Sequence, residues 1–216
     1  MKFFTASFIF VCLVFQMTTQ AQEDWRLRKD QNGIKVFSRK PKGVKFDEIK
    51  VESEYEGRIS QLAAVLYDIG KQYQWVYKTA KSELLKEVSP GDVFFYTEIE
   101  CPWPFDNRDL VVHMIMTQNA STKVMNIEAK SADKYLPEKR KKVRIKYSRA
   151  SWIVTPLNNH RFKVEYHLQI DPGEGAPAWL LNLFSTDGPY ESFRNLKDRL
   201  KLPQYQHARF PTLVDY

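Results

Sequence analysis

The sequence predicts an α+β domain in which an antiparallel sheet of about seven to nine strands curls around a long C-terminal helix and encloses a cavity. Three observations predict this class. Apolar and polar residues alternate over several short segments, which is typical of half-buried strands. Turn signals separate these segments at short intervals, which favours an antiparallel meander. A helical period of apolar residues dominates only the end of the chain, from residue 177 to 200.

The first 21 residues are predicted to be a secretory signal peptide that is not part of the fold. Lys2 precedes an apolar run from Phe3 to Phe15, and Thr19 and Ala21 are small residues at the −3 and −1 positions of a cut after Ala21. The run is shorter than the ~20 residues of a membrane span, and an uncleaved N-terminal anchor is the alternative. We therefore expect a protein exported to the periplasm or secreted. Its residues 22–216 should form a single domain, with a core at 25–201 and a tail at 203–216.

Charge and cysteine content narrow the possible partners. Removal of Lys2 lowers the formal net charge from +7 to +6, and the charges are spread along the chain except for the run Lys139 to Lys142. Such a run is usually solvated, and transient contact with an anionic membrane surface is the alternative. No motif for nucleic-acid binding is recognised. The mature chain keeps only Cys101, so no internal disulfide is possible and packing must stabilise the fold.

The N-terminal part of the chain changes period twice. Residues 23–28 are interpreted as a short lead-in helix, and the turn signal at Asn32 and Gly33 separates it from a strand at 34–38. A second strand is predicted at 46–55, where apolar residues recur on one face. Ser60 can cap a helix at 61–67, and a second short helix is expected at 71–77.

The middle of the chain is predicted to be entirely strand and turn. The clearest strand spans 161–171, where the residues from Phe162 to Ile170 alternate strictly. Further strands are expected at 82–88, 93–100, 109–118, 123–131 and 142–155. The period then becomes helical, with Pro177 in the first turn, and Gly188 and Pro189 are expected to kink this helix.

Sheet width and helix width together predict the cavity. Seven strands at a spacing of about 4.8 Å span roughly 34 Å, whereas a helix with its side chains is about 10–12 Å wide. One helix cannot cover such a sheet, so the sheet must curl around it. Curling leaves room between the concave face and the helix, and that room suits an apolar ligand. Bulky aromatic side chains that fill the room are the alternative.

Several local strings are informative through their order and spacing. They are Trp25, DQNGIKV at 30–36, Trp75, PWP at 102–104, NRDL at 107–110, Val143 with Arg144, and DPGEGAP at 171–177 followed by Trp179 and Asn182. Over roughly 25–200, the chain thereby resembles the START (StAR-related lipid transfer) domain of the Bet v 1-like helix-grip superfamily. The resemblance implies a lipid-sized tunnel that binds a sterol, phospholipid or similar molecule for transfer or sensing. It also implies no metal, no other cofactor and no catalysis.

The resemblance and the strand patterns give a set of candidate ligand-binding residues. Arg108 and Asp109 stand where the family has a charged pair, and a strand-start ion pair that orders the preceding loop is the alternative. Some members place a further charge in the tunnel, and here an apolar face with adaptable Met residues takes its place. The candidate cavity residues are Val112, Met114, Met116, Trp152, Val164, Tyr166, Leu168, Ile170, Leu180 and Phe184, with Arg108 and Arg144 as polar contacts.

An enzyme that uses the same cavity, such as a polyketide cyclase or aromatase or a hydrolase, is the alternative function. Its acid or base would come from Glu98, Arg108, Arg144 or Tyr166. The histidines lack partners at metal-ligand spacing, and His113 and His167 fall on the polar faces of their strands. Cys101 is expected to be a buried thiol. The favoured prediction is therefore a monomer that binds a lipid or sterol-like apolar ligand without catalysis.

Overall fold

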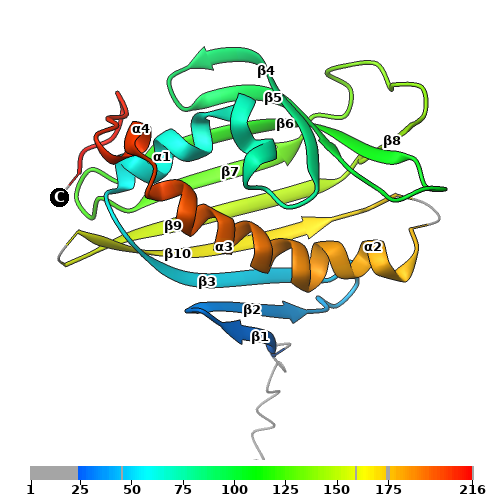
Figure 1. Cartoon of the computed structure of the whole chain (residues 1–216), viewed down its shortest axis with the longest axis horizontal. Helices are drawn as coiled ribbons and strands as arrows, with labels where there is room; N and C mark the ends of the chain where they lie inside the picture. Colours follow the sequence, from blue (N-terminus) through cyan, green and yellow to red (C-terminus); the bar gives the residue numbers. More distant parts are fainter. Residues whose placement is uncertain (1–23, 45, 159, 174–175, 216) are drawn as a thin grey trace, which may run out of the picture.

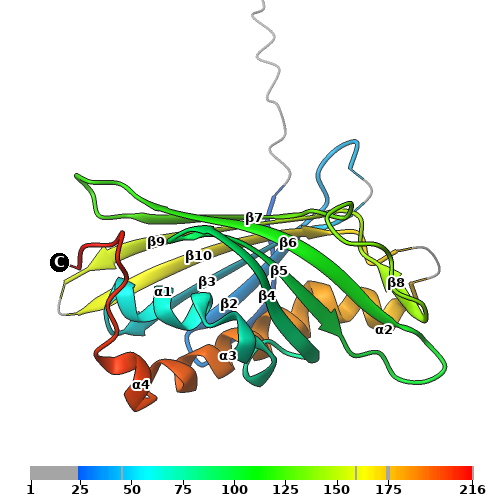
Figure 2. The ribbon, with the colours of Figure 1, turned by 90° about the horizontal axis from the view of Figure 1, so that it is seen from above.

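The computed structural model describes residues 24–44, 46–158, 160–173 and 176–215, whose ten strands form one sheet. A helical layer crosses this sheet diagonally in Figure 1, and Figure 2 shows the two layers from the side. The strands are β1 (Arg26–Gln31), β2 (Ile34–Arg39), β3 (Glu48–Glu56), β4 (Thr79–Ser89), β5 (Asp92–Ile99), β6 (Asn107–Gln118), β7 (Met125–Ser131), β8 (Lys142–Arg144), β9 (Ser148–Leu157) and β10 (Arg161–Ile170). The helical segments are α1 (Ile59–Tyr67), η1 (Ile69–Gln74), α2 (Ala178–Asn182), η2 (Leu183–Asp187), α3 (Gly188–Leu200) and α4 (Pro203–Gln206).

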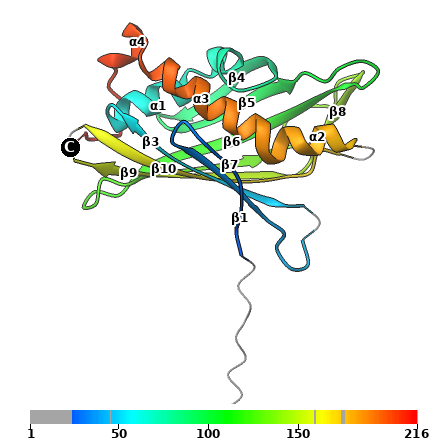
Figure 3. The same ribbon diagram turned by 60° about the horizontal axis from the view of Figure 1, so that its bottom comes forward.

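The sheet is made of two runs of antiparallel neighbours that meet where β3 pairs with β10. The strand order is β1-β2-β3-β10-β9-β7-β6-β5-β4, and the short β8 pairs in parallel with the start of β6. The predicted meander is right within each run and wrong at their junction. Because α1 and η1 carry the chain from β3 to the far edge strand β4, the last strand takes the place beside β3 (Figure 3).

Two of the predicted secondary-structure elements, one helix and one strand, are wrong. Residues 26–28 of the segment interpreted as a lead-in helix belong to β1, which pairs with β2. Asn32 and Gly33 between them have φ of 54° and 75°, the values that a two-residue hairpin turn requires. The strand predicted at 142–155 is two strands, because β8 leaves the line of β9 to pair with β6. These two additions raise the strand number to ten.

The first helix has a different N-terminal partner from the one predicted. α1 begins at Ile59, so Ser60 lies inside it and is not its cap. The carboxylate of Asp215 accepts hydrogen bonds from the backbone N–H of Ser60 at 3.0 Å and from its hydroxyl at 2.6 Å. An acidic side chain from the C-terminal tail therefore satisfies the start of α1 and complements its dipole.

The C-terminal helix runs continuously from α2 through η2 to α3. Leu183–Asp187 is π-helical, and Gly188 follows it directly. A Cβ at Gly188 would lie 2.1 Å from the backbone oxygen of Leu183, so only glycine fits this wide turn. A kink was expected at Gly188 and Pro189; the structure has a π turn just before them, and α3 begins at Gly188.

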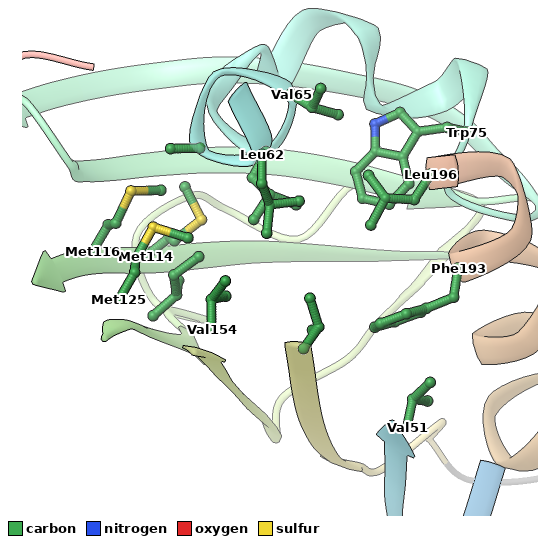
Figure 4. Packing of buried hydrophobic residues seen from close by; sticks show 14 of the residues in the cluster. Val51, Leu62, Val65, Trp75, Met114, Met116, Met125, Val154, Phe193 and Leu196 are labelled. Carbon is green, nitrogen blue, oxygen red and sulfur yellow. The ribbon is translucent and has the colours of Figure 1, made fainter. Parts of the chain in front are cut away.

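One end of the space between sheet and helices is filled by side chains, and we call it the packed end. Leu62 of α1 lies near Met114 and Met116 of β6 and Met125 of β7, as Figure 4 shows. Leu62 and Met125 have no exposed surface. The C-terminal tail covers this region, where the buried Phe210 packs against the ring of Tyr67 at 5.1 Å.

The predicted signal peptide lies outside the described residues. In the described ranges, no helix combines the length and the hydropathy that crossing a membrane requires.

Candidate functional site: an apolar cavity under the C-terminal helix

A cavity of about 240 Å³ lies beside the packed end, between the concave face of the sheet and the helical layer. Six strands supply its floor, and η1, η2 and α3 supply most of its roof. The floor residues are Thr79, Phe95, Thr97, Ile99, Leu110, Val112, Met114, Ile127, Ala129, Ser148, Ala150, Trp152, Tyr166, Leu168 and Ile170. The roof residues are Leu66, Gln72, Trp75, Val76, Tyr77, Leu183, Phe184, Gly188, Pro189, Ser192 and Phe193. None of these residues carries a charge.

The strand register arranges the floor in layers. Ile170 pairs with Ser148 next to the loops at the strand ends, and Tyr166 pairs with Trp152 two layers further in. At about 3.3 Å per residue, the floor extends roughly 13 Å along β10 from Ile170 to Tyr166. We call the Ile170 side the rim and the Tyr166 side the deep end.

The π turn decides which helix residues face the floor. Leu183 and Phe184 line the cavity, followed by Gly188 and Pro189 and then by Ser192 and Phe193. The first step is five residues, as a π turn requires, and the second is four, as in an α-helix. Gly188 therefore permits the wide turn that keeps the helix facing the cavity along its length.

Three aromatic rings separate the deep end from the packed end. The ring centroids of Trp152, Tyr166 and Phe193 lie 4.8 to 5.4 Å apart, and Trp152 stacks on Phe193. Tyr55 supports this group from β3, because its hydroxyl donates to the backbone oxygen of Phe193 at 3.1 Å.

Tyr166 brings a polar atom into the apolar wall. No described residue hydrogen-bonds to its hydroxyl, and this oxygen is not among the buried atoms that are sealed off by protein. Its open side therefore faces the cavity that Tyr166 lines. Burial raises the pKa of Tyr166 above the ordinary value of about 10, so the hydroxyl stays neutral at physiological pH. It can donate or accept one hydrogen bond to a bound molecule.

More than half of the predicted cavity residues line the cavity. They are Val112, Met114, Trp152, Tyr166, Leu168, Ile170 and Phe184. Three apolar candidates lie elsewhere. Met116 and Val164 belong to the packed end. Val164 pairs with Val154, one layer beyond the aromatic rings, and Met116 lies near Leu62 of α1. Leu180 is fully buried in the first turn of α2, ahead of the helix residues that form the roof.

Arg144 was predicted as a polar contact of the cavity and does not line it. Its guanidinium makes a bidentate pair with Asp109 at 2.8 and 3.1 Å, and both side chains are almost fully buried. It also donates to the backbone oxygens of Asp133, Leu136 and Pro137. Hydrogen bonding to Asp109 raises the pKa of Arg144 further. Since β8 pairs with β6, this charge is used to anchor the loop between β7 and β8.

Arg108 is the second predicted charge that lies outside the cavity. Its guanidinium donates to the backbone oxygens of Asp106 at 2.6 Å and Pro172 at 3.4 Å. Cys101 lies beside it, with the thiol sulfur 4.0 Å from Nη1. Arg108 is 3% exposed. It thus joins the β5–β6 loop to the segment after β10, and the predicted ion pair of Arg108 with Asp109 is replaced by the pair of Arg144 with Asp109.

Several lining residues were missed by sequence reasoning. Phe95 shares the inward face of β5 with Thr97 and Ile99, so strand alternation could have found it. Phe193 belongs to the apolar period of the last helix and could have been found in the same way. Trp75 follows η1, and no periodicity indicates its position in the roof.

Two further hollows flank the roof helix and contain charged residues. One has a volume of about 390 Å³ and shares Ile170 and Phe184 with the cavity. The other, of about 280 Å³, shares Tyr77 and Leu183 with it. Their charged residues are Arg28, Lys40 and Asp47 in the first hollow and Lys78, Glu100 and Asp187 in the second. Charge is therefore present on both sides of the helix and absent from the cavity between them.

The histidines and the cysteine considered for metal binding or catalysis do not line the cavity. Within the described ranges, no three His, Cys, Asp or Glu side chains gather closely enough to hold a metal ion. His113 pairs with Asp92 at 2.7 Å, and His167 lies between Glu48 and Glu165 at 3.1 and 2.9 Å. Cys101 is free and buried.

Comparison with known proteins agrees with this architecture. The family model described as START domain matches residues 10–205. An uncharacterised protein of Pseudomonas aeruginosa is 28% identical over 175 residues, which cover 81% of this chain and 86% of that protein. The phosphatidylcholine transfer protein of Rattus norvegicus is 25% identical over 213 residues and 92% of each chain.

Solved structures give the same result. The crystal structure of a STAR-related lipid transfer protein from Xanthomonas axonopodis is similar with a TM-score of 0.75 and 29% identity, over 82% of this chain and 99% of that chain. Human STARD10 shares the fold with a TM-score of 0.72 at 19% identity, over 84% of this chain and 75% of that chain. The chain belongs to the START domain family and has its helix-grip fold.

Proposed function

We propose that this protein binds a lipid or another apolar small molecule in the cavity under its C-terminal helix, for transfer or sensing and without catalysis. The observation that carries the proposal is a concave wall without charges, which is open between the sheet and the helix. Membership of the START family and the similarity to phosphatidylcholine transfer proteins support a lipid as the ligand. An apolar wall of this kind favours the entry of apolar surface and disfavours ions.

The experiment is lipid analysis of the purified protein. Native mass spectrometry should detect a bound adduct, and organic extraction should release the same molecule in a fixed ratio to protein. A protein that carries no adduct and retains no lipid after incubation with vesicles would contradict the proposal.

Catalysis in the same cavity has little chemical support. Of the candidate acids and bases, only Tyr166 lines the cavity, and burial raises its pKa. Glu98 bonds Asn107 at 2.7 Å and pairs with Lys142 away from the cavity wall. A cyclase or hydrolase would require an ionisable group that contacts the substrate.

The proposal includes export and a single domain. The predicted signal peptide would be cut after Ala21, which leaves a monomer that begins at Gln22. Expression of the full chain followed by intact-mass analysis of the exported fraction tests this part. A mass that retains residues 1–21 would instead indicate an N-terminal anchor.

Contact with an anionic membrane is proposed at the rim. Trp103 of the β5–β6 loop is 92% exposed, and β8 pairs Lys142 with Asn107 directly after that loop. The exposed Arg140 and Lys141 therefore approach the loop that carries Trp103. An aromatic ring beside cations suits the interface of an anionic bilayer.

Sedimentation with vesicles of phosphatidylserine and phosphatidylcholine tests this contact. Arg140→Ala with Lys141→Ala should weaken binding about fivefold per residue, since each cation contributes about 1 kcal/mol near the surface. Lys81→Ala is a control, because Lys81 pairs with Glu83 on the edge strand. Equal losses in the double variant and the control would contradict the proposed contact.

A further inference from the structure

The polar atoms inside the cavity constrain the ligand more narrowly than its shape does. A hydroxyl without a protein partner costs free energy in an apolar wall unless a ligand or water bonds to it. The hydroxyl of Tyr166 is in this situation at the deep end. Gln72, Thr97 and Ser192 also line the cavity, but their side chains already donate to the backbone oxygens of Leu66, Lys81 and Gly188. The hydroxyls of Thr79 and Ser148 belong to the rim, where these residues pair with Ile99 and Ile170, and the lining residue Tyr77 comes just before Thr79. The indole nitrogen of Trp75 has no partner either, but it is closed off by protein.

Charged side chains lie around the cavity but do not line it. The two flanking hollows contain cations and carboxylates, whereas the cavity between them contains neither. Arg108 and Arg144, which the sequence predicted as polar contacts of the ligand, donate instead to backbone oxygens and to Asp109. A charged group that entered the cavity would lose its water and meet no counter-charge, which is strongly unfavourable.

The distance of Tyr166 from the rim also predicts how a ligand is oriented in the cavity. Tyr166 lies roughly 13 Å from the rim along β10, among the rings of Trp152 and Phe193. A molecule whose polar end bonds to Tyr166 must therefore insert that end first and leave its apolar body along Leu168 and Ile170. An ion cannot take this position, but a hydroxyl or a carbonyl group can.

We infer that the cavity selects neutral ligands, each with a hydroxyl or carbonyl at one end that enters first and hydrogen-bonds to Tyr166. Ligands with a charged or zwitterionic end are excluded from this position. The inference rests on the proposed function, since it names the class of molecule that the same cavity takes. It separates this chain from its phosphatidylcholine transfer relatives, whose named ligand carries a phosphate and an ammonium group.

Two ten-carbon probes test the inference by calorimetric titration at pH 8. 1-Decanol is neutral, whereas decanoate has a similar chain with a charged end. We expect 1-decanol to bind at least tenfold more tightly than decanoate. The Tyr166→Phe variant should bind 1-decanol roughly threefold to tenfold more weakly, which corresponds to one hydrogen bond, and should leave decanoate binding unchanged.

Tyr205→Phe is the matched control. It removes the same atom from another buried tyrosine, but the hydroxyl of Tyr205 donates to Asp68 at 2.7 Å and Tyr205 does not line the cavity. Its affinity for 1-decanol should equal that of the unmodified protein. Decanoate binding as tight as 1-decanol binding would overturn the inference. An unchanged affinity of Tyr166→Phe for 1-decanol would overturn it too.

Failure of the proposed function has a different signature. In that case neither probe binds, and the purified protein also carries no extractable lipid. If lipid is extracted and decanoate binds as well as 1-decanol, the proposed function stands and the selection of neutral ligands is wrong.

Discussion

The packed end and the cavity are built on the same concave sheet face, but one is solid and the other is hollow. Met116 and Met125 lie near Leu62 of α1, and Val164 pairs with Val154 of the same cluster. Leu168 and Ile170 lie on the same strand as Val164, yet the helix above them is the π turn of η2. Side chains of similar chemistry thus form a core or a binding wall according to what covers them.

This contrast teaches that inward alternation along a strand does not distinguish core from cavity. All inward residues of β10 are apolar or aromatic from Phe162 to Ile170. Phe162 and Val164 have no exposed surface, whereas Tyr166, Leu168 and Ile170 keep accessible surface inside the protein. The boundary lies at the rings of Trp152, Tyr166 and Phe193, which close the packed end.

The largest expected effect compares the stability of the two ends. Leu62→Ala should lower the free energy of unfolding by about 2–5 kcal/mol, because it empties a fully buried position. Leu168→Ala widens a space that is already open and should cost less than about 2 kcal/mol. Urea denaturation of both variants measures the difference. Equal costs would show that the two ends are packed alike.

The next largest effect is on ligand uptake. A tryptophan is introduced once in the cavity and once at the packed end, and the two variants are compared. Leu168→Trp fills the cavity and should reduce retained lipid at least about tenfold, with the free energy of unfolding changed by less than about 1.5 kcal/mol. Met116→Trp overpacks the packed end, so it should cost about 1–3 kcal/mol of stability. Lipid content per chain after vesicle incubation is the measurement. Normal uptake by Leu168→Trp would place the ligand elsewhere.

The smallest effect is a difference in pH dependence at the boundary of the two ends. Burial raises the pKa of Tyr166, so the folded protein keeps this proton above pH 10 while the unfolded chain releases it. The stability due to the neutral hydroxyl is complete below about pH 10 and is lost as the pH rises further.

Tyr166→Phe should therefore lose stability less steeply than the unmodified protein above pH 10, by about 1 kcal/mol per pH unit. Urea denaturation at pH 8 to 11.5 gives both slopes, and lysine deprotonation affects the two proteins equally. Parallel slopes would show that the Tyr166 hydroxyl is solvated and not enclosed.

Local patterns in the chain determined the strands, the last helix and the family. Alternation on β6 and β10 placed Val112, Met114, Tyr166 and Leu168 on the inner face, because side chains of a strand point alternately to opposite sides. The excess of sheet width over helix width predicted a space under the helix. These predictions use only the order of apolar and polar residues within short segments, which the sequence states directly.

Tertiary structure alone decided which part of that space is hollow and that no charged side chain lines it. Arg108 and Arg144 were predicted near the ligand, but partners distant in sequence or on separate loops hold both of them elsewhere. Met116 and Val164 became part of the buried core, whereas Leu168 became part of the wall of a cavity that Leu183, Phe184 and Gly188 also line. The alternation of a strand states which side a residue faces, but only the packed fold states what is on that side.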